Sequence, residues 1–552
     1  MKSKFYFFDS DALKNFHKRI FFSITIFFFV YLIAFYRIFD VMILDSEIIE
    51  KQNSSQIIER GKIYDRNGNL LSSTIRSYAL SVNPKKIKNK LILSKNLSQI
   101  ISVPADELIK LFSKKDEFVW IKKNISPKEH QSIIDLGEVA LQTQHKYEEE
   151  LKRIYPYGQT GSHILGFVND SGNGQSGVER GLNVFLANGK DINLSIDINL
   201  QETIRKELKL VIEKYSADAG FALVMDINNG ELLSMSSLPD FDPNKRSSLI
   251  EKNIFNRIIS GNYEMGSVIK PITITTGIYK KIIKPEMTFD VSKSISGIND
   301  FHPYNGFYNV KEIVVNSSNI GTAQIASLIG KKNQKDFFKK IGFNKKIDFE
   351  IKESAKPLGN IYNWGNHETM RIGYGYSFSI TPLHLVKAYA SLANDGFQVN
   401  PTILKKITEE KEIKIIDSKT SQYFTSLLRS VVTDTKFTGK KVQIDGYQIG
   451  GKTGTANLLD EKGNYQEGHN LTSFIAVFPT SKPKYVVLSS IENPKKYKDI
   501  KYKLTGATVA APLVKNIILR MIEILNVLPT NYDEILKADI SSIYQKQNNA
   551  SF

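Results

Sequence analysis

The stretch Tyr263–Pro271 reads Tyr-Glu-Met-Gly-Ser-Val-Ile-Lys-Pro, and it guides the interpretation of the whole chain. It contains a Ser-x-x-Lys motif, in which Ser267 and Lys270 are three residues apart. Proline is tolerated only in about the first turn of a helix, so Pro271 predicts a helix that begins close to Ser267. Residues i and i+3 share a helix face, so we expect the Ser267 hydroxyl and the Lys270 amine to lie on the same side.

Serine and lysine are residue types that can act together as a nucleophile and its base. A serine hydroxyl is a poor nucleophile until an adjacent base takes its proton. Lys270 can serve if burial or a second cation lowers its pKa, and a helix N-terminus favours the negative charge that develops nearby. The motif is weak by itself, because Ser481–Lys484 has the same pattern and is typical of a surface turn.

Two further motifs follow in order. Ser317-Ser318-Asn319 contains Ser-x-Asn about fifty residues after Ser267, although similar triplets occur elsewhere by chance. Lys452-Thr453-Gly454-Thr455 occurs once, and its small residues would let a ligand backbone lie against a strand edge. The candidate site residues are therefore Ser267, Lys270, Ser317, Asn319, Lys452, Thr453, Gly454 and Thr455.

An apolar segment near the N-terminus predicts a membrane anchor. Residues Ile20–Tyr36 are almost wholly apolar and would span about 25 Å as a helix, the short end for a bilayer, and Val41–Leu44 extend the stretch. Basic residues outnumber acidic ones before it, which predicts a cytoplasmic N-terminus. A cleaved signal peptide is the alternative, but Ala34–Arg37 does not supply the small-x-small ending that cleavage needs.

Composition limits the possible classes. The chain has 552 residues, 41% hydrophobic and 24% charged, which indicates two or three globular domains. It has no cysteine, which excludes a disulfide framework, a thiolate zinc site and a cysteine nucleophile. The net charge of +17 could indicate nucleic-acid or membrane-surface binding. No basic run is interleaved with aromatic residues, so we interpret the surplus as solvated surface.

The pattern of turns and apolar runs predicts an α+β architecture. After a polar stalk at residues 45–60, Asn67-Gly68 predicts a hairpin turn. Residues 194–197 are strand-like, 200–215 form an amphipathic helix, and 220–226 with 230–236 predict a second hairpin. Helices and strands then alternate irregularly to about residue 525, which favours helices packed on an antiparallel sheet.

Taken together, the motifs resemble the signature of penicillin-binding proteins and serine β-lactamases. The flanking segments that share this resemblance are Asp242–Asn244, Tyr263–Ser267, Ser317–Gly321, Ile372–Gly375 and Thr381–Leu383. Three earlier segments resemble the pedestal domain of class B penicillin-binding proteins, most of all the division-specific septal type: Arg60–Gly68, Arg153–Pro156 and Gly177–Glu179. Met265 stands where the family usually has proline and Ala476 where glycine is common, but neither change removes a reactive group.

The resemblance implies a division into five parts. They are a cytoplasmic tail (1–19), a transmembrane helix (20–44), a pedestal domain of the class B dimerisation type (45–190), a transpeptidase domain (191–528) and a polar C-terminal tail (529–552). The pedestal lacks the length and a recognisable acidic motif for glycosyl transfer, so glycan polymerisation is expected from a partner.

The resemblance also implies a mechanism. Ser267 would attack the penultimate D-Ala carbonyl of a peptidoglycan stem peptide, with Lys270 as base and Ser317 as proton relay. Asn319 would bind the substrate amide backbone, and the backbone N–H groups of Ser267 and Thr455 would form the oxyanion hole. Lys452, Thr453 and Thr455 would hold the terminal carboxylate, and no metal or organic cofactor is needed.

The expected role is septal cross-linking at the plasma membrane, with the catalytic domain outside the cytoplasm. The expected partners are stem peptides, β-lactam antibiotics, a polytopic glycosyltransferase and other division proteins in the membrane, and no nucleic acid. The alternatives are an elongation-type transpeptidase and a hydrolytic D,D-carboxypeptidase or β-lactam-sensing relative. A β-lactamase would need a water-activating base such as a loop glutamate, and a non-catalytic scaffold would not need the intact reactive residues.

Overall fold

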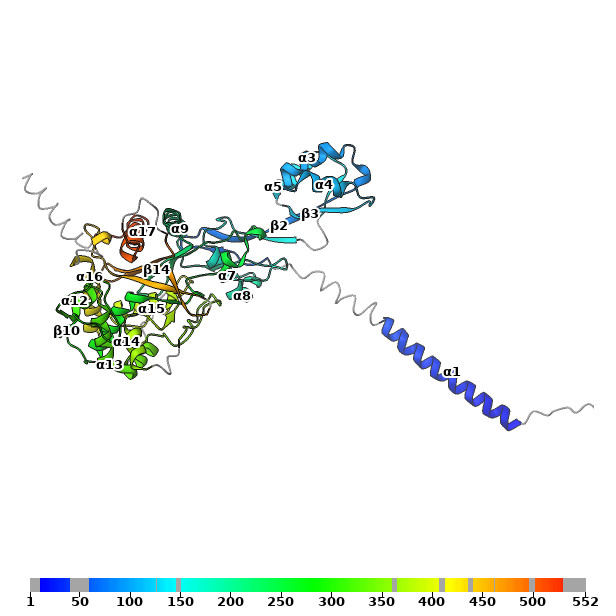
Figure 1. Cartoon of the computed structure of the whole chain (residues 1–552). Helices are drawn as coiled ribbons and strands as arrows, with labels where there is room; N and C mark the ends of the chain where they lie inside the picture. Colours follow the sequence, from blue (N-terminus) through cyan, green and yellow to red (C-terminus); the bar gives the residue numbers. More distant parts are fainter. Residues whose placement is uncertain are drawn as a thin grey trace, which may run out of the picture. The chain divides into compact units, whose positions relative to one another are not determined.

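The computed structural model describes residues 10–39, 59–125, 127–144, 150–359, 365–406, 413–434, 440–460, 462–495 and 502–529 (Figure 1). Residues up to Ile58 form one unit and the rest another. In the first unit, α1 (Ser10–Phe39) contains the apolar window His17–Arg37, which is long and apolar enough to cross a membrane. The expected stalk up to residue 58, the apolar extension at 41–44, and the expected tail beyond residue 529 lie outside the described residues.

The first sheet of the second unit is built around the long strand β2 (Leu70–Val82). β2 pairs antiparallel with β1, β3, β4 and β5, and β1 pairs parallel with β6. The turn predicted at Asn67-Gly68 joins β1 to β2, where the Asp65 carboxylate accepts the N–H of Asn67 at 2.8 Å. The other strands are β1 (Ile63–Tyr64), β3 (Val119–Ile125), β4 (Leu141–Gln144), β5 (Glu150–Ile154) and β6 (Ile192–Asn193).

Three helices pack on the far end of β2 and give that end its own core. Apolar residues at helical spacing, among them Leu93, Leu97 and Leu108, are buried against Leu80 and Val82 of β2. The helices are α3 (Lys90–Ile101), α4 (Ala105–Phe112) and α5 (Pro127–Asp135). Short helices follow at α6 (Ser162–Leu165), α7 (Gly177–Gly181) and α8 (Asn183–Ala187).

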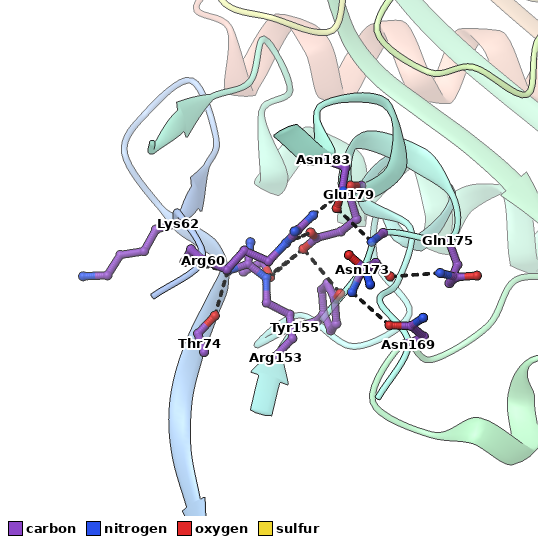
Figure 2. Close-up of polar contacts among 12 residues, drawn as sticks. Arg60, Lys62, Thr74, Arg153, Tyr155, Asn169, Asn173, Gln175, Glu179 and Asn183 are labelled. Carbon is purple, nitrogen blue, oxygen red and sulfur yellow. Dashed lines mark hydrogen bonds and ion pairs between the residues drawn. The ribbon is translucent and has the colours of Figure 1, made fainter. Parts of the chain in front are cut away.

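A buried ionic cluster ties these segments together (Figure 2). The Glu179 side chain, on α7, is 0% exposed and accepts from Arg60 Nε at 2.7 Å and from Arg153 Nε at 2.8 Å. Arg153 also donates to Thr74 Oγ1 at 3.2 Å, and the Tyr155 hydroxyl lies 3.4 Å from the same carboxylate. Each carboxylate oxygen therefore has its own guanidinium, so one buried carboxylate is the shared counter-charge of two arginines that are far apart in sequence.

The second sheet is fully antiparallel, with strand order β13-β14-β15-β7-β8. The hairpin predicted for 220–226 and 230–236 is confirmed as β7 and β8. The Ser481–Lys484 copy of the motif lies in the exposed turn between β14 and β15, as its pattern indicated. The strands are β7 (Ala219–Asp226), β8 (Leu232–Leu238), β13 (Gly450–Leu459), β14 (Tyr465–Phe478) and β15 (Tyr485–Glu492).

Helices cover both faces of this sheet, because residues on both faces of its central strands are apolar. Ala222 and Val224 pack with α9 (Ile198–Lys214) and α17 (Ala511–Ile524), whereas Phe221 and Leu223 face the core that contains α15 (Pro382–Ala393). Figure 1 shows α9 and α17 on one side of β14, with α15 on the other. The remaining longer helices are α11 (Lys270–Tyr279), α13 (Asn319–Lys340), α14 (Asn366–Gly373) and α16 (Ser418–Thr433).

One strand prediction was wrong in its position. The strand expected at 194–197 lies two residues earlier, as β6, and Leu194 makes only an isolated bridge to Leu404. Asp197 is instead the N-cap of α9, where its carboxylate accepts the N–H groups of Asn199 and Leu200. A side chain that satisfies two free N–H groups of a helix ends the strand before it. The amphipathic helix expected at 200–215 is confirmed as α9.

Candidate functional site

The Ser267 segment is held by close backbone approaches. Ser267 lies in a 3₁₀ turn (Gly266–Ile269) that leads directly into α11, so the helix start predicted from Pro271 is confirmed. Gly266 has a φ of +57° and donates its N–H to Gly375 O at 3.0 Å. A Cβ on Gly375 would lie 2.0 Å from Gly266 O, so only glycine fits there. The buried Tyr389 hydroxyl fixes a second carbonyl of this segment, because it donates to Val268 O at 2.6 Å.

The Ser-x-Asn motif lies in the short turn between α12 (Val310–Val315) and α13. Ser317 has a φ of +59°, a conformation that costs a non-glycine residue free energy and so needs support from its surroundings. Ser318 is the N-cap of α13, and its hydroxyl accepts the N–H of Gly321 at 2.9 Å. The motif therefore combines a strained serine with a capped helix.

Asp300 holds the three residues that follow Ser317, and the sequence prediction missed it. Its carboxylate accepts the Ser318 hydroxyl at 2.6 Å and the backbone N–H groups of Asn319 and Ile320. A carboxylate at a helix N-terminus satisfies free N–H groups and the positive end of the helix dipole. The capping serine was a signal that a helix begins at Asn319, but nothing local identified a carboxylate 18 residues upstream.

The Lys-Thr-Gly motif lies on β13, an edge strand of the second sheet. A Cβ on Gly454 would lie 3.0 Å from Met265 O and 3.1 Å from Val268 Cγ1, so glycine lets this strand approach the Ser267 segment. Thr455 Oγ1 accepts the N–H of Gly506 at 3.1 Å, and Tyr376 donates to Thr455 O at 3.4 Å. The small residue therefore favours the close packing that places β13 beside Ser267.

The three motifs meet around one hydroxyl. Ser317 Oγ lies 3.3 Å from Lys270 Nζ and 2.9 Å from Lys452 Nζ. Lys270 Nζ also donates to Ser317 O and to Asn319 Oδ1, the latter at 2.8 Å. Two carbonyl-type acceptors use the two N–H bonds of a neutral amine, so its lone pair is left for a hydroxyl proton. Ser317 thus bridges two lysines that come from different motifs.

Burial changes the protonation of both lysines. Lys270 is 0% exposed and Lys452 is 1% exposed. Burial, and then the positive charge of Lys452, lower the pKa of Lys270 well below its usual value, with Asp300 opposing them. Burial lowers the pKa of Lys452 to about 7. No hydrogen bond or ion pair among the described residues joins either amine to a carboxylate, so neither lysine has an ion-pair partner that would restore its usual pKa.

Two expected contacts differ from the observed geometry. No hydrogen bond among the described residues joins Ser267 Oγ to Lys270 Nζ, because the amine is turned toward Ser317 and Asn319. Catalytic hydrogen bonds are often long in the free enzyme and tighten when substrate binds. Asn319 uses its amide within the protein, with Oδ1 on Lys270 and Nδ2 on Asn299 O at 2.9 Å. The substrate-binding role of Asn319 stays a prediction.

Comparison with known proteins gives the same domain order. Residues 220–519 match the penicillin binding protein transpeptidase domain, and residues 56–191 match the penicillin-binding protein dimerisation domain. The probable peptidoglycan D,D-transpeptidase FtsI of Caulobacter vibrioides is 31% identical over 491 residues, which cover 85% of this chain and 82% of that protein. The probable peptidoglycan D,D-transpeptidase PenA of Neisseria meningitidis is 29% identical, covering 85% of each.

A solved structure shows the same fold. A peptidoglycan synthetase from Bifidobacterium adolescentis aligns with a TM-score of 0.66 at 20% identity, covering 86% of this chain and 96% of that one. The stage V sporulation protein D of Bacillus subtilis is a further relative in sequence, 28% identical over 85% of this chain and 79% of its own length. The α+β architecture predicted from the sequence is confirmed.

Proposed function

The chain belongs to the penicillin-binding transpeptidase family and is a serine D,D-transpeptidase of class B, and we propose that it cross-links peptidoglycan through an acyl-enzyme on Ser267. The observation that carries the residue assignment is the convergence of three motifs on the Ser317 hydroxyl, with Lys270, whose pKa is lowered by burial, on one side and Lys452 on the other.

Acylation begins when Ser267 Oγ attacks the carbonyl carbon of the penultimate D-Ala, while its proton passes to the Lys270 amine. The oxygen of the tetrahedral intermediate accepts from the N–H groups of Ser267 and Thr455. Tyr376 donates to Thr455 O at the outer edge of β13, the edge that lies next to Gly266 and Ser267. The N–H and C=O groups of one strand residue point to the same side of the strand, so the Thr455 N–H also faces the Ser267 segment. This geometry supports the proposed oxyanion hole.

Collapse of the intermediate breaks the bond to the terminal D-Ala. The departing amine takes a proton from Ser317, which is replenished from Lys270 through the contact that joins them. An amine of a neighbouring stem peptide then attacks the acyl-enzyme ester, gives its proton to Lys270 and restores the Ser267 hydroxyl. One D-Ala is released for each cross-link formed, and no cofactor is needed.

Residues of β13 bind the substrate carboxylate. Lys452 provides the cation, and the hydroxyls of Thr453 and Thr455 provide neutral donors, with Gly454 allowing the strand to lie next to Ser267. Asn319 orients the substrate amide, which requires its amide group to exchange partners on Lys270 and Asn299. Because Lys452 also contacts Ser317, carboxylate binding and proton relay share one side chain.

We also propose a septal role, a membrane anchor with a cytoplasmic N-terminus and a catalytic domain outside the cytoplasm. The apolar window in α1 and the similarity to a protein named FtsI support this assignment. The expected division into residues 1–19, 20–44, 45–190, 191–528 and 529–552 is kept as part of the proposal, as is a polytopic glycosyltransferase partner. A fluorescent β-lactam that labels the side wall instead of the septum in dividing cells would favour the elongation-type alternative.

Covalent labelling tests the nucleophile directly. After treatment of the full-length protein with a penicillin, peptide mass spectrometry should find the adduct on Ser267, and Ser267→Ala should carry none. Ser481→Ala, in the exposed copy of the motif, is the matched control and should be labelled like the wild type. An adduct on another serine would overturn the assignment.

A further inference from the structure

A cavity of about 460 Å³ lies away from the transpeptidase site, where the segments around α6 and α7 meet residues 241–260 and 351–353. Its size is within the range of small-molecule sites, which run to roughly 300–1,000 Å³. Much of its wall is apolar, from side chains that include Phe241, Phe255, Ile254, Ile259 and Ile351. A wall of this kind suits the apolar body of a small molecule.

Three residues of the wall keep buried polar atoms that have no hydrogen-bond partner among the described residues: Ser176 Oγ, Asn256 Nδ2 and Glu353 Oε2. The other ends of two of them are occupied, because Asn256 Oδ1 accepts the N–H of Ile258 and Glu353 Oε1 accepts the N–H of Gly177. Buried polar groups are nearly always paired, so these orphans are a signal for a ligand. They offer one amide donor, one carboxylate acceptor and one hydroxyl.

The charge of the lining is negative. Glu251 and Glu353 carry carboxylates, and no lysine or arginine is among the described residues that line the cavity. His163 donates its Nε2–H to Asn253 O, and its burial lowers its pKa to about 4, so it adds no charge at neutral pH. The exposed Arg180 approaches Glu353 Oε1 only to 3.9 Å and leaves Oε2 unpaired.

We propose that this cavity binds a small organic cation, in which a primary ammonium and a neighbouring carbonyl oxygen are attached to an apolar body. The ammonium donates to Glu353 Oε2, the carbonyl accepts from Asn256 Nδ2, and the apolar body lies against Phe241 and Ile259. The proposal is independent of the transpeptidase reaction, because neither Glu353 nor Asn256 belongs to the transpeptidase site.

Calorimetric titration of the full-length protein in detergent tests the proposal with phenylalaninamide as the probe. We expect saturable binding at one site. N-acetylphenylalaninamide, which keeps the ring and the carbonyl but has no charge, should bind at least about tenfold more weakly, as expected when a charge-assisted hydrogen bond is lost. Glu353→Gln, which keeps an acceptor for Gly177, should weaken the charged probe by a similar factor.

Asp348→Asn is the matched control, because it removes a carboxylate from an exposed side chain outside the cavity and should leave binding unchanged. Penicillin labelling of Glu353→Gln at the wild-type rate would show that its fold and its reactive site are intact. Equal binding of the charged and neutral probes, or equal binding to wild type and Glu353→Gln, would contradict the proposal. Absence of binding by both probes would also overturn the proposal and would favour a protein partner as the ligand of the cavity.

Discussion

Two buried clusters of this chain each bring two basic side chains together, and they differ in the group that lies between them. In the first sheet, Glu179 lies between Arg60 and Arg153, with one guanidinium on each carboxylate oxygen (Figure 2). At the transpeptidase site, the Ser317 hydroxyl lies between Lys270 and Lys452. The two arginines, Glu179 and the two lysines are at most 9% exposed, whereas Ser317 is only partly buried.

This difference in the central group gives the two clusters different roles, one in stability and one in proton transfer. Arginine keeps its proton in proteins, so Arg60 and Arg153 need the carboxylate and gain stability from it. Lysine can lose its proton, and burial without a carboxylate partner lowers the pKa of Lys270, which favours its neutral, basic form. Cations that are paired hold segments together, whereas the unneutralised lysine pair is available for proton transfer. Exchanging the residue types between the clusters should therefore damage different properties.

The largest expected effect is on Lys270→Arg, which places a group that cannot deprotonate where a base is needed. The second-order rate of penicillin acylation should fall by about 10²–10⁴-fold, the contribution typical of general bases. Thermal melting should show a lower midpoint, because the buried guanidinium has no counter-charge, so the rate is measured at a temperature at which the variant is folded. Lys484→Arg, in the exposed copy of the motif, should leave the rate unchanged. A folded Lys270→Arg protein that acylates within about threefold of wild type would show that Lys270 acts only through its charge.

Glu179→Gln should be the most damaging change in the ionic cluster. It keeps the shape of the side chain but leaves two buried guanidinium groups without a counter-charge, which typically costs about 3–5 kcal/mol. Urea denaturation should show this loss, and the folded variant should still acylate at nearly the wild-type rate. Glu117→Gln removes an exposed partner of Lys85 and is the control for charge alone. An unchanged unfolding transition for Glu179→Gln would mean that the cluster is not structural.

Arg153→Lys is the opposite exchange of residue types to Lys270→Arg. Its effect, which is on the free energy of unfolding, should be smaller. Lysine keeps the positive charge next to Glu179 but cannot also reach Thr74 Oγ1 and Arg60 O, which the guanidinium contacts at 3.2 and 3.3 Å. We expect a loss of about 1–3 kcal/mol in the free energy of unfolding, the cost of leaving buried acceptors unpaired. The acylation rate should be unaffected. If acylation falls while stability is unchanged, the cluster has a role in catalysis that we have not assigned.

Much of the fold followed from local patterns in the sequence. The hairpins at Asn67-Gly68 and residues 228–230, helix α9 and the helix start near Ser267 were each predicted from turn residues, apolar spacing or a proline. The misplaced strand at 194–197 shows the limit of this reasoning, because Asp197 could serve either as a strand end or as a helix cap. Sheet order could not be predicted, since β7 pairs with a strand more than 250 residues later.

The reactive residues were easier to predict than their contacts. Motif order predicted Ser267, Lys270, Ser317 and Lys452 as reactive residues, which stays a prediction, and the structure brings the last three together. The role of Asp300 depends on a long-range approach to the N-terminus of α13, and no sequence pattern encodes that approach. The turn of Lys270 toward Asn319 depends in the same way on packing. The binding roles assigned to Thr453, Gly454 and Thr455 stay predictions.

The pH dependence of acylation tests most directly whether Lys270 is neutral when the protein is at rest. Acylation needs the unprotonated Lys270, so the rate should rise with pH through the lowered pKa of Lys270 and stop rising well below the usual lysine value of about 10.4. A β-lactam carboxylate needs the protonated Lys452, so the rate should fall again above about pH 7. We therefore expect a bell-shaped profile of the second-order rate constant for wild-type protein. A rate that climbs without a plateau to about pH 10 would mean that Lys270 is an ordinary charged lysine, and it would contradict the assignment of Lys270 as the base.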